Sequence, residues 1–294
     1  MSTITIFCKS YKNDLERAVK LVESIRKFNV DSLPLYFSVP NSDLGLFRER
    51  IGKDVIWLTD EAIIEKNPDI SLNEYSALPG QLSQQIVKAE FWRLNPANNY
   101  LCVDSDCLFI RNFTRTDFIA PNDFPYTVMH EGKEFALFLL SHELLHVLRE
   151  LEGIKLKFRN LFGRKGVSYN FGPFPVIWNN NVWRKLASDF LVKQEMTILD
   201  AIVAYPSEAY WYGEAILKFQ SIPLMPREPL FKAYLFYEEF EHDKKFGVTE
   251  KTLADQYIGV VYQSNWYPKR LRLSKRFAYK IKKLLKKVRR VSSV

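Results

Sequence analysis

Residues 98–113 read NNYLCVDSDCLFIRNF, so an apolar strand runs directly into two aspartates one residue apart and then resumes as an apolar segment. Alternate residues of a strand point to the same side of a sheet, so the carboxylates of Asp104 and Asp106 repel each other unless a positive charge lies between them. The stretch therefore predicts a bound cation at the end of a strand.

The residues before this stretch alternate between strand and helix patterns. Apolar, β-branched runs predict strands, and capped stretches with apolar residues three or four apart predict helices. In chain order, the expected strands are 3–8, 33–39 and 54–60, and the expected helices are 13–28, 41–51 and 80–94. The predicted fold class is α/β, a mixed and mostly parallel Rossmann-like sheet flanked by helices, in which ligands bind beyond the carboxyl ends of the strands. Asp104 and Asp106 lie at such an end.

The second half of the chain has a less regular pattern. We expect a strand within 169–180 and late strands within 222–226 and 259–266; the expected helices are 134–151, a pair over 181–204, and 206–220. No internal repeat or low-complexity linker divides the chain. The prediction is one domain over residues 1–265, with a donor half at 1–113 and an acceptor half at 114–265, followed by a tail at 266–294.

Composition limits the class of protein. The 294 residues are 47% hydrophobic, as in an ordinary globular protein, and they contain neither an apolar run of about 18 residues nor a signal-peptide pattern at the N-terminus. A cytoplasmic location is therefore the default expectation. The cysteines Cys8, Cys102 and Cys107 all lie in apolar strand-like segments, so we expect them to be reduced and buried.

The net charge of +8 is concentrated in the tail. Residues 269–290 contain 12 cations and no acid, which leaves 30 cations against 34 acids in the rest of the chain, a net charge of −4. Apolar tail residues recur at spacings of three or four: Leu273, Phe277, Ile281, Leu284, Val288 and Val291. A basic amphipathic helix of this kind is typical of contact with an anionic membrane surface, which we expect through residues 269–291. Nucleic-acid binding is disfavoured, because the rest of the chain is acidic and contains no recognised nucleic-acid-binding motif.

The pattern QLSQQIVKAEFWRL…NNYLCVDSDCLFIRNF resembles the GT-A glycosyltransferases that use nucleotide sugars. It is most similar to bacterial enzymes that build cell-surface polysaccharides such as capsule, O-antigen and lipooligosaccharide, and the later segments YNFGPFPVIWNNNVWRKL and SEAYWYGEAIL fit their acceptor half. The resemblance covers about residues 3–265 and is close over 81–113. It implies a GT-A fold and a hexosyltransferase-type reaction from a nucleotide sugar, most commonly a UDP-sugar, to a hydroxyl of a surface glycan or lipid-linked acceptor.

The resemblance also implies roles for particular residues. Asp104 and Asp106 would bind Mn²⁺ or Mg²⁺ together with the donor diphosphate, so that the ion neutralises the leaving group. Nucleotide or donor contacts are implied for Lys9, Ser10, Tyr11, Asp60 and Lys88. The H-x-x-G-x-x-K motif of many retaining members is absent, which leaves the stereochemistry and the third metal ligand open.

Glu208 is the candidate catalytic base, because an inverting transferase needs a carboxylate to take the proton of the attacking hydroxyl. Its aromatic neighbours suit an acceptor cleft, in which we expect Tyr210, Trp211 and Glu214 to contact the acceptor. The structural alternative is that Glu208 interacts with the dipole of its helix and that Glu214 is a solvated helical acid.

Two other classes of function stay open. His142, Glu143 and His146 match the H-E-x-x-H signature of zinc hydrolases, although a leucine stripe predicts an ordinary amphipathic helix with both histidines in solvent. The third possibility is a peripheral membrane protein without catalysis, which depends on the tail alone. The favoured interpretation is a cytoplasmic, peripheral enzyme at the inner face of a bacterial plasma membrane; the sequence does not indicate its oligomeric state.

Overall fold

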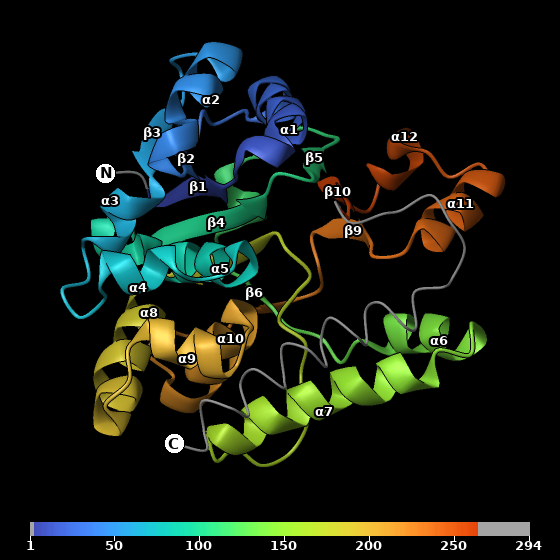
Figure 1. The fold of residues 1–294 in the computed structure, drawn as a ribbon. Helices are drawn as coiled ribbons and strands as arrows, with labels where there is room; N and C mark the ends of the chain where they lie inside the picture. Colours follow the sequence, from blue (N-terminus) through green and yellow to red (C-terminus); the bar gives the residue numbers. More distant parts are fainter. Residues whose placement is uncertain (1–2, 264–294) are drawn as a thin grey trace.

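A five-stranded sheet forms the centre of residues 3–263, the part of the chain that the computed structural model describes (Figure 1). Its order is β3-β2-β1-β4-β7, and only β7 is antiparallel to its neighbour. The strands are β1 (Ile4–Lys9), β2 (Leu35–Val39), β3 (Ile56–Thr59), β4 (Asn99–Asp104) and β7 (Val176–Asn179). The predicted mixed, mostly parallel sheet is confirmed.

Two smaller sheets contain the remaining strands. The apolar segment after Asp106 is β5 (Cys107–Phe109), which leaves the central sheet and pairs with β10 (Gly259–Tyr262), itself paired with β9 (Phe231–Tyr234). A two-stranded sheet joins β6 (Thr127–Val128) to β8 (Pro226–Arg227). The late strands expected at 222–226 and 259–266 are thus present in part, whereas β9 was not expected.

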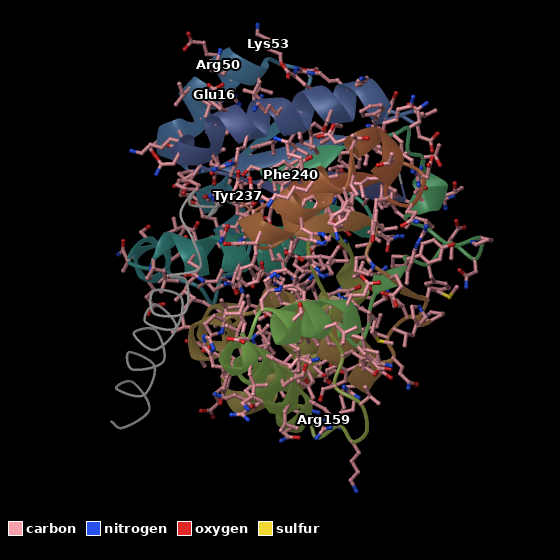
Figure 2. All side chains as sticks on the ribbon, turned by 90° about the vertical axis from the view of Figure 1, so that its right-hand side faces the viewer. Glu16, Arg50, Lys53, Arg159, Tyr237 and Phe240 are labelled. Carbon is pink, nitrogen blue, oxygen red and sulfur yellow. The ribbon has the colours of Figure 1, made fainter. Side chains whose placement is uncertain are left out.

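Helices cover both faces of the central sheet. The helices of residues 3–263 are α1 (Leu15–Phe28), α2 (Leu44–Ile51), α3 (Asp60–Ile64), α4 (Leu72–Ser76), α5 (Gly80–Glu90), α6 (Lys133–Ser141), α7 (Leu145–Leu161), α8 (Asn180–Lys185), α9 (Ile198–Ala204), α10 (Glu208–Phe219), α11 (Tyr237–Lys245) and α12 (Glu250–Leu253), with a π-helical turn at Leu186–Leu191 after α8. Figure 1 shows α1 and α2 on one side of the sheet and α5 and α8–α10 on the other. An ion pair of 2.8 Å between Arg50 and Glu16 joins α2 to α1 on the outer surface (Figure 2).

Two apolar clusters lie on the two faces of the sheet, because successive strand residues point to opposite faces. In β1, Ile6 and Cys8 pack in the cluster with α1 and α2, whereas Phe7 packs in the cluster with α5 and α8–α10. Every residue of β1 is buried. Burial on both faces explains the continuous apolar run of this strand, as is usual for parallel sheets covered by helices.

The helix expected over 134–151 is wrong as one continuous element. It is broken between α6 and α7, where Glu143 takes a left-handed backbone conformation with φ of 58°. The N–H of Leu144 donates to the carbonyl of Leu139 (2.8 Å), and the N–H of Glu143 donates to that of Leu140 (3.1 Å). This is the bonding of a Schellman helix end, and Leu139 and Leu144 are both buried beside it.

Within residues 3–263, no helix combines the length and the apolar character needed to cross a bilayer. The predicted basic amphipathic helix at 266–294, with its expected membrane contact at 269–291, lies outside the described residues.

Candidate functional site

The carboxyl ends of β1–β4 meet at one edge of the central sheet, because these four strands are parallel. The strand register places Lys9 beside Asp104 on one side and beside Ser38 on the other. Side chains that the sequence places at separate strand ends are therefore neighbours. This edge is the candidate functional site.

Asp104 is the last residue of β4, and its side chain is 32% exposed. Asp106 follows in the turn that connects β4 to β5, and its carbonyl accepts a hydrogen bond from the N–H of Tyr262 at the end of β10 (3.0 Å). The departure of β5 into the second sheet thus leaves Asp104 at the end of β4 and Asp106 in the turn that follows it.

Lys88 of α5 joins two of the predicted site residues. Its ammonium group lies 2.5 Å from Asp104 Oδ1 and 3.4 Å from Glu208 Oε1, and it lies over the ring of Phe174 at 4.1 Å. Burial alone would lower the pKa of Lys88, but the carboxylates of Asp104 and Glu208 reverse this effect and raise the pKa above its usual range. Lys88 is therefore a permanent buried cation between two carboxylates.

Glu208 is the first residue of α10, and the hydroxyl of Ser207 caps this helix by accepting the N–H of Tyr210 (3.3 Å). Glu208 is only 6% exposed. Burial raises the pKa of its carboxyl group above the usual range, an effect that the charge of Lys88 opposes and that of Asp104 supports. A carboxyl group with a raised pKa accepts and releases protons nearer to neutral pH than an ordinary glutamate.

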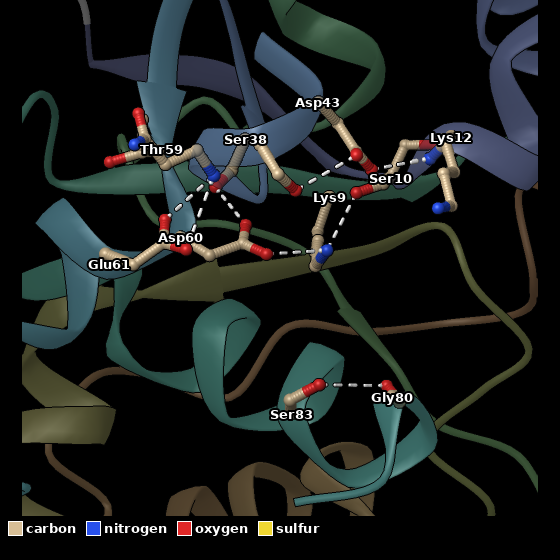
Figure 3. Close-up of polar contacts among 12 residues, drawn as sticks. Lys9, Ser10, Lys12, Ser38, Asp43, Thr59, Asp60, Glu61, Gly80 and Ser83 are labelled. Atoms are coloured by element: carbon tan, nitrogen blue, oxygen red, sulfur yellow. Dashed lines mark hydrogen bonds and ion pairs between the residues drawn. The ribbon is translucent and has the colours of Figure 1, made fainter. Parts of the chain in front are cut away.

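A second cluster, Lys9, Ser38 and Asp60, fills the edge at the ends of β1–β3 (Figure 3). The ammonium group of Lys9 lies 2.7 Å from Asp60 Oδ2 and donates to the carbonyl of Ser10 (2.7 Å), while Ser38 Oγ donates to Asp60 Oδ1 (2.6 Å). Burial raises the pKa of Asp60, although Lys9 opposes this shift. The sequence predicted Lys9 and Asp60 but not Ser38, which lies within an apolar strand.

Two neighbours of this cluster differ in exposure. Ser10 is buried, and its hydroxyl has no hydrogen-bond partner among residues 3–263. Tyr11 is 44% exposed at the rim. A buried hydroxyl without a protein partner beside an exposed aromatic ring is a suitable surface for a polar ligand with a flat base.

The residues expected to contact an acceptor are not gathered on an open surface. Trp211 is 1% exposed, and its indole N–H donates to the carbonyl of Tyr205 (3.0 Å). Tyr210 is half-buried, with its hydroxyl donating to Asn170 Oδ1 (2.6 Å). Glu214 is 1% exposed, and both of its oxygens accept hydrogen bonds from Arg164, at 2.7 and 2.9 Å. Of the three residues expected to contact the sugar acceptor, Tyr210 has the most accessible side chain.

Replacement of Arg164 by methionine should destabilise the protein strongly, because Glu214 would become a buried carboxylate without its cation. Breaking a buried pair on one side costs about 3 kcal/mol or more. Urea unfolding measures the change, and Arg149→Met, at an exposed arginine of α7, is the matched control. Adding Glu214→Gln to Arg164→Met should restore part of the loss. Equal midpoints for Arg164→Met and Arg149→Met would show that the pair contributes nothing.

The H-E-x-x-H segment does not form a zinc site. His142 ends α6, Glu143 has the left-handed conformation, and His146 belongs to α7, so the two histidines do not share one continuous helix. In the described part of the chain, no three His, Cys, Asp or Glu side chains are grouped to hold a metal ion. Within the same residues, Asp104 and Asp106 likewise have no third protein ligand of these types.

The three cysteines are free and buried, as predicted. Cys8 lies in β1, Cys102 in β4 and Cys107 in β5. Burial raises the pKa of each thiol well above its usual value, and the charge of Asp104 adds to the effect. Cys8 and Cys102 serve as small apolar residues of the central sheet beneath the candidate site, and Cys107 does so in the sheet of β5 and β10.

The chain is similar to a protein-family model and to a solved structure. A family model described as "Family of unknown function (DUF6492)" matches residues 3–159, a stretch from the start of β1 to near the end of α7. No curated protein sequence matches the chain. Among solved structures, the apo form of mouse xyloside xylosyltransferase 1 is similar, with 9% sequence identity and a TM-score of 0.45, over 89% of this chain and 98% of that chain.

Proposed function

The chain belongs to DUF6492, a family of unknown function, and from its site we propose that it transfers a sugar from a nucleotide-sugar donor to a hydroxyl of a glycan. The observation that carries the proposal is the position of Asp104 at the carboxyl end of β4, beside Lys9 and paired with Lys88, which also contacts Glu208. Asp106 lies in the turn directly after it. Acidic, basic and buried polar groups thus meet at the sheet edge where nucleotides bind in α/β folds.

Asp104 and Asp106 are the proposed ligands of a divalent cation. Carboxylate oxygens suit Mg²⁺ and Mn²⁺, which proteins commonly hold through one or two carboxylates, with substrate phosphates and water completing the shell. A pair of aspartates without a third protein ligand fits this mode of binding. When bound, the ion supplies positive charge that stabilises the departing nucleoside diphosphate.

Lys88 is proposed to position the two carboxylates that flank it. Its ammonium group holds Asp104 toward α5 through an ion pair of 2.5 Å, and it also lies 3.4 Å from the proposed base Glu208. Glu208 would take the proton of the acceptor hydroxyl as the new glycosidic bond forms. This role requires the carboxylate form of Glu208, so activity should fall as the pH decreases through the raised pKa of this group.

The Lys9, Ser38 and Asp60 cluster, with Ser10 and Tyr11, is the proposed nucleotide-binding part of the site. Ser10 offers a buried hydroxyl, and Tyr11 offers a partly exposed ring on which a base can stack. The proposed donor is a UDP-sugar of the hexose type. The proposed acceptor is a bacterial surface glycan or lipid-linked glycan at the inner face of the plasma membrane, approached from the cytoplasm through the basic tail.

Calorimetric titration of UDP into the full chain tests the proposal directly. With Mn²⁺ present we expect saturable heat of binding, and with EDTA in place of Mn²⁺ we expect that heat to disappear, because the diphosphate would face two aspartates without a cation between them. AMP with Mn²⁺ is the control for unspecific nucleotide binding. Equal binding of UDP in Mn²⁺ and in EDTA, or no binding in Mn²⁺, would contradict the proposed donor site.

A further inference from the structure

A polar cavity of about 400 Å³ lies at the other end of β4 from Asp104. Six of its lining residues are asparagines: Asn95, Asn98, Asn99, Asn179, Asn180 and Asn181. Asn99 begins β4 and Asp104 ends it, so roughly 16 Å of strand separates this cavity from the candidate site at the rise of a β-strand. The cavity is therefore distinct from the donor site.

The antiparallel pairing of β4 and β7 explains why the asparagines meet. Asn99 at the start of β4 is the register partner of Asn179 at the end of β7, and Asn179 Nδ2 donates to Asn99 Oδ1 (2.7 Å). Asn179 Oδ1 also accepts the N–H of Asn181 and so caps α8 (2.8 Å). The amides of Asn99 and Asn179 thus have structural roles.

The side-chain amide of Asn180 has only some of its hydrogen bonds made by the protein. Its Nδ2 donates to Asn95 Oδ1 (2.9 Å) and to the carbonyl of Ala97 (2.8 Å), which assigns the orientation of the amide. Its Oδ1 then has no hydrogen-bond partner among residues 3–263, although Asn180 is only 3% exposed. Buried acceptors nearly always have a partner, and an unmet one costs about 1–3 kcal/mol. This oxygen has almost no accessible surface, so a donor in the cavity would reach it only after the lining side chains move.

The charges of the lining residues favour a neutral ligand. The lining contains one acid, Asp123, which is paired with Arg115, and one cation, Arg184, which donates to Asn181 Oδ1 (2.6 Å). Charges of one sign are therefore not grouped in the cavity. An anion would call for grouped cations, and a hard metal ion for grouped carboxylates. An amide offers donors and an acceptor side by side, which matches hydroxyl groups, since these also donate and accept.

Phe124 and Ile222 are the apolar residues of the lining. A saccharide combines hydroxyl groups around its edge with apolar C–H surface, and an aromatic or aliphatic side chain can cover the latter while amides bind the former. The cavity volume falls in the range of about 300–1,000 Å³ that is usual for small-molecule sites. We propose that this asparagine cavity binds a neutral saccharide, at a site separate from the proposed transferase site.

Saturation-transfer difference NMR on the full chain tests this inference, with maltose, cellobiose, lactose and N,N′-diacetylchitobiose as probes. At least one disaccharide should bind the wild-type chain. Asn181→Trp and Asn98→Trp, each at an exposed position of the lining, should fill the cavity and weaken that binding at least about tenfold. Thermal unfolding of both variants shows whether they keep the native fold.

Asn160→Trp, the same substitution at an exposed asparagine of α7, is the matched control and should bind as the wild type does. Absence of binding by all four probes to the wild-type chain would overturn the inference. So would equal binding by folded Asn181→Trp, Asn98→Trp and wild-type chains, because the saccharide would then lie elsewhere. The measurement needs neither donor nor metal, so its result is independent of the proposed transferase activity.

Discussion

Sugar transfer is expected to fall roughly 1,000-fold when Asp104 and Asp106 are both replaced by asparagine. The amides keep the shape of the turn but remove the two negative charges that would hold the divalent cation. A catalytic metal contributes several kcal/mol of transition-state stabilisation, and about 4 kcal/mol corresponds to three orders of magnitude in rate. The measurement is release of UDP from UDP-sugar with a glycan acceptor, together with calorimetric binding of UDP in Mn²⁺.

The matched control is Asp69→Asn/Asp255→Asn, which removes the same charge from two exposed positions and should leave transfer unchanged. Circular dichroism must show that both double variants are folded. Lys88 keeps its contact with Glu208 in the Asp104→Asn/Asp106→Asn chain, so its charge is not left alone. Transfer within tenfold of wild type in that variant would remove the aspartates from the mechanism.

Glu208→Gln is expected to lower the rate of transfer by about 100-fold or more, since a positioned general base contributes about 10²–10⁴. Binding of UDP with Mn²⁺ should persist, because the substituted carboxylate is proposed to act on the acceptor. The raised pKa of Glu208 gives a second signature. In the wild type, activity should fall on acidification at a pH above the usual range of a glutamate, and the variant should lose this dependence.

Glu195→Gln, at an exposed glutamate before α9, is the control for loss of a carboxylate and should change neither rate nor pH profile. A purely structural role for Glu208 predicts a different pattern, in which donor binding and thermal stability decrease together. A normal turnover rate in folded Glu208→Gln would eliminate Glu208 as the base.

The sequence predicted the central sheet because parallel strands covered on both faces consist of continuous apolar runs. β1, β2 and β4 could be recognised in this way, and β3 has an apolar run although it is a partly exposed edge strand. The position of Asp104 at a carboxyl end followed from the alternation of strands and helices. The path of β5 could not be predicted, since its partner β10 lies more than 100 residues later in the chain.

The contact between Lys88 and Glu208 also could not be predicted from the sequence. Each residue was a separate candidate, but they are 120 positions apart, and only the packing of α10 near α5 brings Glu208 to the ammonium group that also binds Asp104. Local patterns describe spacing within one element, and they do not identify which side chains from distant elements meet.

Residues of α10 show how composition can mislead. Trp211 and Glu214 are three positions apart, so they share one helical face, and that face is buried. The aromatic and acidic character of the segment favoured an acceptor surface, yet the cation that neutralises Glu214 is Arg164, from the turn after α7. The break at Glu143 was hidden for a related reason, because a glutamate occupies the left-handed position where glycine is usual.

The burial of Cys8, Cys102 and Cys107 makes the native chain inert toward thiol reagents, which attack the thiolate. These are the three cysteines of the whole sequence. A cysteine introduced at the rim of the candidate site would therefore be the single target of a fluorophore or spin label in the folded protein. The rate at which Cys8 and Cys102 are labelled would in turn measure how often the central sheet opens, because β1 and β4 must separate from their neighbours before these sulfurs are reached.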